Sequence, residues 1–195
     1  TIHIYPGVYQ EIFPMTVPEG VTVKGHSMRS VNITPTVATN SNDAFLLNGG
    51  ATIEDLTISG FYTGYAFKFA PGFVVAGNNR SPYMRNLSVI TMGSVTSAAD
   101  PRGFAQGDAG KGAYIDGSVA GLTSLEATML FHSATFITPG VDAITVTNGA
   151  RVEWLNSFTY FANRGIYGVD GATGLRGAGK TAVRVTGLTG TIVDT

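Results

Sequence analysis

The chain has 195 residues, of which 26 are Gly and none is Cys. Only 13% of the residues are charged, about half the usual fraction, so the composition excludes coiled coils, collagen and long exposed helices. A formal net charge of −1 gives no electrostatic basis for binding nucleic acid or an anionic membrane. The absence of Cys excludes disulfides, and no apolar run approaches the length of a membrane span, so we expect no membrane insertion.

Short runs of β-branched and aromatic residues, separated by Gly, Asn and Pro, recur along the chain and predict an all-β structure. The clearest runs lie at residues 21–23, 44–47, 66–69, 143–146 and 182–185. Thr and Val suit pleated, half-buried strands better than helices. The stretches at residues 70–82, 93–112 and 162–181 are predicted to be loops inserted between strands.

An internal repeat is the most informative feature of the sequence. The segment Asp43–Leu56 aligns without gaps on Asp142–Leu155, at an offset of 99 residues (142 − 43). A shorter pattern consists of an apolar residue, two spacers, a leucine and then Thr, Ser or Asn. It recurs with leucine at positions 56, 87, 122, 155 and 188, which are separated by 31, 35, 33 and 33 residues. Helical repeats of this length need two amphipathic helices per unit, and the sequence has none, so we predict a β-solenoid in which these leucines stack in one interior ladder.

The predicted fold is therefore all-β, a right-handed single-stranded parallel β-helix (solenoid). We expect about six coils of roughly 33 residues with inserted loops, forming one domain over residues 1–195. Because the chain opens in the middle of a strand pattern, we expect it to be an excerpt of a longer one.

Candidate catalytic and metal-binding groups do not cluster in the sequence. If coils stack about 4.8 Å apart, Asp43 and Asp142 lie three coils apart, roughly 14 Å, and Glu54 and Glu153 are separated in the same way. That separation is too large for the paired carboxylates of a glycosidase. The histidines at positions 3, 26 and 132 share no metal-ligand spacing. We therefore assign no catalytic residue, no metal ligand and no cofactor, and we expect a scaffold more than an enzyme.

Residues 174–181 (GLRGAGKT) match the phosphate-loop pattern of P-loop proteins. A nucleotide site of that type needs a helix directly after the loop, whereas residues 182–193 have a strand pattern with two glycines. We interpret the segment as a Gly-rich turn. Nucleotide binding is the alternative, and it predicts that ATP raises the melting temperature.

Aromatic residues gather in two places, around Phe61 and around Phe158. The first group contains Phe61, Tyr62 and Tyr65, and the second contains Phe158, Tyr160 and Phe161. Exposed aromatic rings can stack on sugars, which makes Tyr62, Tyr65 and Tyr160 the candidate glycan-binding residues. Packing in the interior or at an oligomer contact is the interpretation that we favour for both groups.

Two resemblances add to this picture. The segment Tyr5–Gly25 contains Gly7-x-Tyr9-x-Glu11, then a strand and a glycine, and resembles the first coil of pectin methylesterases and related pectin-lyase-like β-helix proteins. The paired Asp, Gln and Arg pattern of those enzymes is missing, so this resemblance implies the fold and not the activity. Residues 142–165, together with the loop 110–118, look like β-helical stretches in virion structural proteins of tailed phages.

The second resemblance implies a tail-fibre, tailspike or baseplate role, with a virion or extracellular location. It also implies a homo-oligomer, usually a trimer, or contacts with other virion proteins, and host polysaccharide as a ligand. Our first hypothesis is a structural and adhesive β-solenoid module of such a fibre. The alternative is a carbohydrate-active enzyme of the pectin-lyase-like superfamily, a polysaccharide lyase or glycosidase whose acids come from neighbouring chains. Release of reducing or unsaturated sugars would distinguish the two hypotheses.

Overall fold

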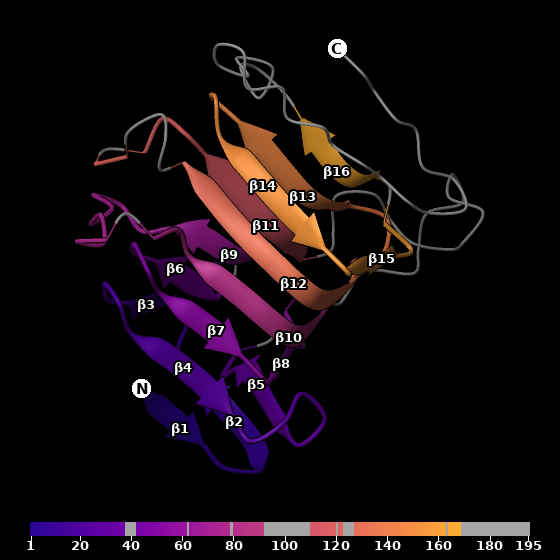
Figure 1. Cartoon of the computed structure of the whole chain (residues 1–195). Coiled ribbons are helices and arrows are strands. Elements are labelled where there is room, and N and C mark those ends of the chain that lie inside the picture. The colour runs from indigo at the N-terminus through magenta and orange to yellow at the C-terminus, as the bar shows by residue number, and fades with distance from the viewer. Residues whose placement is uncertain are drawn as a thin grey trace.

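The structure is a computed structural model that describes residues 1–37, 42–61, 63–78, 80–91, 110–119, 121–122, 127–162 and 164–168. Within these ranges the chain forms strands joined by turns and contains no helix. Consequently none of the described segments is a long apolar helix of the kind that crosses a membrane. Figure 1 shows the strands stacked from the indigo N-terminal end to the orange and yellow strands at the opposite end.

The strands lie in three columns, and within each column every strand pairs in parallel with the next. The first column contains β1 (Ile2–Ile4), β4 (Thr22–Gly25), β7 (Thr52–Glu54), β10 (Tyr83–Ile90), β12 (Thr128–Ile137) and β14 (Arg151–Leu155). The second contains β2 (Gly7–Glu11), β5 (Val31–Pro35), β8 (Thr57–Ser59), then β10 and β12 again, and β15 (Phe158–Tyr160). The third contains β3 (Met15–Val17), β6 (Phe45–Leu47), β9 (Tyr65–Phe69), β11 (Lys111–Asp116), β13 (Asp142–Thr147) and β16 (Arg164–Gly168).

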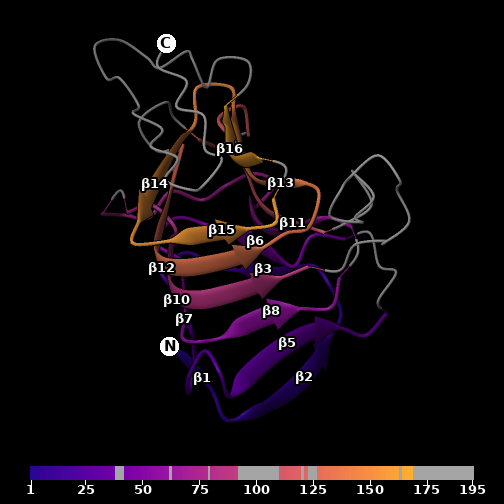
Figure 2. The same ribbon diagram turned by 90° about the vertical axis from the view of Figure 1, so that its right-hand side faces the viewer.

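The long strands β10 and β12 belong to both of the first two columns and join them into one 10-stranded sheet. The third column is a separate 6-stranded sheet. Figure 2 looks onto the second column, where β2, β5, β8, β10, β12 and β15 follow one another from bottom to top. The predictions of an all-β structure and of parallel strand pairing are therefore confirmed.

A bend between the first and second columns explains the leucine pattern in the sequence. Four residues at this bend have positive φ angles, Asp55 (60°), Asn86 (49°), Ser133 (54°) and Asn156 (47°). Asn and Asp tolerate this left-handed conformation better than other side chains do. The bend interrupts the alternation of the strand, so apolar residues three positions apart both point inward.

The register shows where the predicted leucine ladder holds and where it is wrong. Ile53 and Leu56 flank the first of these bends, Met84 and Leu87 flank the second, and all four side chains are fully buried. The next bend is flanked by Phe131 and Ala134 and the last by Trp154 and Ser157, so Leu155 does not join the ladder but pairs with His132. Leu122 lies outside the strands, and Leu188 lies outside the described residues.

The regular spacing of about 33 residues is also wrong for the later strands. Ile53, Met84, Phe131 and Trp154 are register partners, yet they are separated by 31, 47 and 23 residues (84 − 53, 131 − 84 and 154 − 131). The two copies of the 99-residue repeat occupy equivalent positions in the strand register only at their start. Glu54 pairs with Arg85 and Glu153 with Leu130, and these two partners belong to different rows of the sheet.

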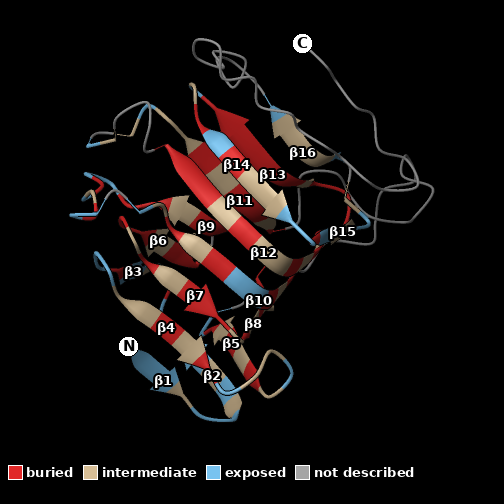
Figure 3. Cartoon of the chain, viewed as in Figure 1, coloured by how far each residue is buried: buried red, intermediate tan, exposed pale blue. Residues whose placement is uncertain are grey.

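The interior between the columns is filled by apolar side chains, many of them aromatic. Phe67 lies at its centre, with ring centroids 6.1 Å from Phe45, 5.8 Å from Phe131 and 6.4 Å from Phe136. Buried and more exposed residues alternate as bands along β7, β10 and β12 in Figure 3, as expected for strands with one face in a core. Each column therefore presents one set of side chains to the core and one set to solvent.

Candidate functional site

A group of polar and aromatic side chains lies on the outward face of the 6-stranded sheet. Register places Lys68 of β9, Tyr114 of β11 and Thr145 of β13 next to one another across adjacent strands. Phe67, Ala113 and Ile144, which precede them in the same strands, are fully buried. Because successive side chains of a strand point to opposite sides, the packed core behind this face holds the outward row in place.

An aromatic pair with two cationic neighbours forms the centre of this site. The rings of Tyr65 and Tyr114 have centroids 5.2 Å apart and are tilted by 46°. The Nζ atom of Lys68 lies 5.8 Å from the Tyr65 centroid and 5.5 Å from the Tyr114 centroid. The Nζ atom of Lys111 lies 5.5 Å from the Tyr65 centroid. Both ammonium groups are thus within the range of cation–π attraction.

Carboxylates hold two of the cations of this face in defined positions. Asp43 lies 3.1 Å from the Nζ of Lys68, and its Oδ1 accepts a 2.9 Å hydrogen bond from the backbone N–H of Tyr65. Arg164 donates two hydrogen bonds of 2.6 Å to Asp142, an arrangement in which each carboxylate oxygen accepts one. Such fork-shaped pairs fix orientation as well as charge.

A hollow of about 350 Å³ opens beside Lys68 and Tyr114. Its lining residues are Lys68, Phe69, Pro71, Gly72, Tyr114, Asp116 and Val119. The Oδ1 of Asp116 accepts hydrogen bonds from the backbone N–H of Ser118 (2.8 Å), from its hydroxyl (2.7 Å) and from Nδ2 of Asn148 (2.8 Å). The hollow therefore combines an ammonium group, a phenol and an oriented carboxylate with apolar walls, which is the composition of small-ligand sites.

Two groups of the site have shifted pKa values. Burial acts to raise the pKa of Asp116, but the hydrogen bonds from Asn148 and Ser118 outweigh it, so this pKa lies below its ordinary value. The pKa of Tyr65 is raised, mainly by burial and further by Tyr114 and nearby carboxylates, while a hydrogen bond with Thr145 acts in the opposite direction. At neutral pH the site therefore offers an ionised Asp116 and a protonated Tyr65.

We expect the replacement Asn148→Gly, which keeps a residue that tolerates the positive φ of this position (53°), to raise the pKa of Asp116 towards its ordinary value, because one of the hydrogen bonds that stabilise the ionised carboxylate is lost. A carboxyl group with a lowered pKa stabilises the fold above its unfolded-state pKa, and this contribution is lost as the pH falls through the folded-state pKa. The variant should thus lose stability near neutral pH but little in strong acid. Carboxyl NMR titration and urea unfolding measure the two effects, and an unchanged Asp116 titration would contradict the assignment.

The structure separates the residues that the sequence proposed for glycan binding. Tyr65 lies in the aromatic pair on the 6-stranded sheet, whereas Tyr160 lies on β15 in the other sheet, between Phe158 and Phe161. Tyr62 lies outside the described residues. We favoured packing in the interior or at an oligomer contact for both groups. Phe61 is fully buried in the interior, whereas the three rings of the second group are about half exposed, so for that group only the oligomer contact stays a prediction.

Sequence reasoning missed the main neighbours of Tyr65, namely Tyr114, Lys68 and Asp116. The signal for Tyr114 and Asp116 was present, since residues 113–116 have the alternation of a strand directly after the loop predicted at 93–112. The strand β11 begins at Lys111, two residues inside that predicted loop. What the sequence does not contain is the register that brings β9 and β11 together across 46 residues (111 − 65).

The histidines and the Gly-rich segment that the sequence analysis considered do not form a second site among the described residues. His132 is a half-buried strand residue whose Nδ1 lies 2.9 Å from the Tyr83 hydroxyl, and in the described ranges no three His, Asp or Glu side chains come together as a metal site requires. The Gly-rich segment 174–181 lies outside the described residues.

Glu54 is buried between two cations, with Oε1 2.7 Å from the Nζ of Lys24 and Oε2 paired to Arg85. Hydrogen bonds with Glu54 and Asp55 raise the pKa of Lys24.

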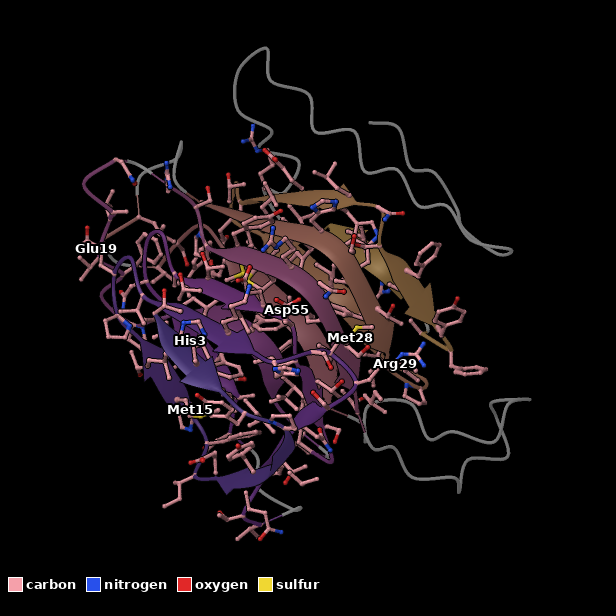
Figure 4. The ribbon with its side chains drawn as sticks, turned by 60° about the horizontal axis from the view of Figure 1, so that its bottom comes forward. His3, Met15, Glu19, Met28, Arg29 and Asp55 are labelled. Atoms are coloured by element: carbon pink, nitrogen blue, oxygen red, sulfur yellow. The ribbon has the colours of Figure 1, made fainter. Side chains whose placement is uncertain are left out.

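A second hollow, of about 430 Å³, opens at the N-terminal end of the stack. Figure 4 views this end from below and labels His3 and Met15, two of its lining residues. Its walls are mostly apolar, because β1, β2 and β3 are the last of the described strands in their columns and leave core side chains uncovered at this end. We therefore regard it as the open end of the core and the Tyr65–Tyr114 face as the candidate site.

Comparison of the chain with protein-family models, with curated proteins and with solved structures finds no match in any of the three.

Proposed function

We propose that this chain is a structural and adhesive module of a phage tail fibre or a similar extracellular virion protein, built as a right-handed parallel β-helix of about six coils. The three columns support this architecture, because each pass of the chain adds to every column one strand, or half of β10 or β12. Gly7, Tyr9 and Glu11, the residues that resemble pectin-lyase-like proteins, all lie in β2. In this proposal the module acts in a homo-oligomer, a trimer by resemblance, or with other virion proteins.

The observation that carries the adhesive role is the Tyr65–Tyr114 pair beside the hollow at Lys68 and Asp116. A sugar ring has an apolar face that packs on aromatic rings and a rim of hydroxyls that needs donors and acceptors. Here the two tyrosines supply the ring faces, Lys68 supplies a donor and Asp116 supplies an acceptor. The strands that carry these four side chains are packed on a filled core. The side chains are therefore positioned before a ligand arrives, which lowers the entropic cost of binding.

The carboxylates favour binding over catalysis as the role of this face. Asp43 is paired with Lys68 and Asp142 with Arg164, so neither is a free acid or base. The register places Asp43 and Asp142 three strands apart, roughly 14 Å at about 4.8 Å per strand, which is outside both glycosidase geometries. Asp43 and Asp142 therefore do not form the acid pair that the enzyme alternative requires.

The test is a binding screen of the purified protein against an array of bacterial capsular and O-antigen polysaccharides, followed by titration of the best ligand. We expect at least one polysaccharide to bind, and we expect Tyr114→Ala to weaken the Kd by about two- to tenfold, which corresponds to ~0.5–1.5 kcal/mol for one aromatic contact. We also expect no release of reducing or unsaturated sugars during the incubation.

Tyr160→Ala is the matched control, because it removes an exposed tyrosine from the other sheet. The Kd of this variant for the same polysaccharide should equal that of the unmodified protein. The assignment of the site fails if Tyr160→Ala weakens binding as much as Tyr114→Ala does. The adhesive role itself fails if no polysaccharide on the array binds.

A further inference from the structure

The chain contains two Asn-Gly sequences, Asn48-Gly49 and Asn148-Gly149. An asparagine side chain can react with the backbone nitrogen of the next residue, and glycine favours this reaction because it has no Cβ to obstruct the approach. Both sequences lie in turns that join a strand of the third column to a strand of the first, β6 to β7 and β13 to β14 (Figure 1). The structure therefore allows a direct comparison of the two sites.

The first Asn-Gly sequence is buried and hydrogen-bonded at both residues. Asn48 is 8% exposed, its Nδ2 donates a 3.2 Å hydrogen bond to the carbonyl of Val17, and its Oδ1 accepts a 2.8 Å bond from the N–H of Val74. The N–H of Gly49 donates a 2.7 Å bond to the carbonyl of Val74. The Gly49 nitrogen can reach Cγ of Asn48 only if these bonds break inside the packed structure, so the fold protects this site.

The second Asn-Gly sequence lies in an exposed turn whose central peptide group is not hydrogen-bonded. The turn is closed by a 3.1 Å bond from the N–H of Ala150 to the carbonyl of Thr147. The φ angles of Asn148 and Gly149 are 53° and 75°, as in a type I′ turn. Within the described part of the chain, neither the N–H of Gly149 nor the carbonyl of Asn148 takes part in a hydrogen bond.

A flip of this central peptide group makes the reaction possible. The flip converts a type I′ turn into a type II′ turn and keeps the hydrogen bond that closes the turn, while ψ of Asn148 changes to about −120°. This rotation brings the Gly149 nitrogen beside Cγ of Asn148. The side-chain bonds that must break, from Nδ2 of Asn148 to Asp116 and to Ser118, lie at the exposed surface, where water can replace them.

We propose that Asn148 is a site of spontaneous deamidation and that its conversion disables the hollow beside Asp116. The nitrogen of Gly149 forms a bond with Cγ of Asn148, the Cγ–Nδ2 bond breaks, and ammonia leaves with the proton of the Gly149 amide. Water then opens the resulting succinimide ring at one of its two carbonyl carbons. The product is aspartate or isoaspartate, and in both a carboxylate replaces the side-chain amide.

The consequence falls on Asp116, whose Oδ1 accepts a 2.8 Å hydrogen bond from Nδ2 of Asn148. Burial acts to raise the pKa of Asp116, and the hydrogen bond from Asn148 is the largest of the contributions that lower it. A carboxylate at position 148 removes this donor and adds a like charge, which disfavours the ionised form of Asp116. The hollow that Lys68 and Tyr114 line thereby loses its oriented acceptor.

Mass spectrometry of tryptic peptides follows the two sites separately. Asn148 is the only Asn in peptide 112–151, which contains no Gln, and fragmentation localises Asn48 within peptide 30–68. During incubation of the folded chain at mildly alkaline pH, we expect Asn148 to deamidate several-fold faster than Asn48. In urea the two rates should become similar, because the fold no longer protects Asn48. Equal rates in the folded chain, or a difference that persists unchanged in urea, would overturn the proposal.

Two variants test the effect on Asp116. Asn148→Asp reproduces the aspartate product, and Asn148→Gly is the matched control, because it removes the donor without adding a charge. Both residues tolerate the positive φ of this position. By carboxyl NMR titration, we expect a higher pKa for Asp116 in Asn148→Asp than in Asn148→Gly. The same titration in both variants would show that the new carboxylate does not act on Asp116, which contradicts the proposal.

The effect on ligand binding rests on the proposed function, whereas deamidation is measured without a ligand. With a polysaccharide that binds the unmodified chain, we expect a weaker Kd for Asn148→Asp than for Asn148→Gly, and equal values would contradict the loss of the site. If no polysaccharide binds, the adhesive role fails and the deamidation result stands. If a polysaccharide binds and Asn148 deamidates no faster than Asn48, only this inference fails.

Discussion

Replacing Phe67 by alanine is expected to lower the free energy of unfolding by about 3–5 kcal/mol, the usual cost of truncating a buried phenylalanine. Phe67 is fully buried and its ring contacts the rings of Phe45, Phe131 and Phe136. These neighbours come from both sheets, so the cavity would open where the columns meet. The backbone of each column is held by strand pairing and can close around it only in part. Urea unfolding followed by circular dichroism measures the change.

Phe161→Ala is the control for this prediction, because it removes the same side chain from a position that is 55% exposed. We expect it to change the free energy of unfolding by much less than Phe67→Ala does. Equal stability of the two variants would contradict the placement of Phe67 in a core that the two sheets share.

The second large effect is expected from Gly25→Ala, which should destabilise the fold by about 1–3 kcal/mol through overpacking. A Cβ atom at Gly25 would overlap the backbone carbonyl of Asp55, and it would lie 3.1 Å from the Cβ of Leu56. The carbonyl cannot move freely, because Asp55 forms the left-handed bend between β7 and β8. Thermal unfolding measures the loss as a lower Tm.

Gly77→Ala is the matched control, since a Cβ atom at Gly77 would meet nothing within 4 Å. Its Tm should stay close to that of the unmodified chain or rise slightly, because alanine restricts the unfolded chain more than glycine does. A normal Tm for Gly25→Ala would contradict the close approach of β4 to the bend at Asp55.

Much of the fold could be predicted because strand alternation and the bend leave local traces in the sequence. Ile53 with Leu56 and Met84 with Leu87 satisfy the pattern of two inward residues around a bend. The pattern fails at the next bends because any apolar or small residue satisfies the same geometry. Ala134 and Ser157 take the leucine position there, while Val152–Leu155 imitates the pattern two residues too early.

The candidate site was less predictable, because it depends on which strands become neighbours. Tyr65 was identified from its aromatic character alone, and the same reasoning selected Tyr160, which lies on the other sheet. Nothing local distinguishes a tyrosine beside Lys68 and Tyr114 from one beside Phe158. Many residues separate the paired strands along the chain, and their varying number conceals the register on which the site depends.

The uneven length of chain between partner strands has a consequence for how such a protein can evolve. Met84 and Phe131 are 47 residues apart and Phe131 and Trp154 only 23, yet each pair keeps the same register. Doubling the length of a flexible loop costs only about 0.6 kcal/mol, whereas one residue added inside a strand sends every following side chain to the opposite surface. Insertions and deletions are therefore tolerated between strands, where they leave the register of the paired strands unchanged. A lineage can therefore gain or lose whole segments between strands while it inherits the same strand pairing.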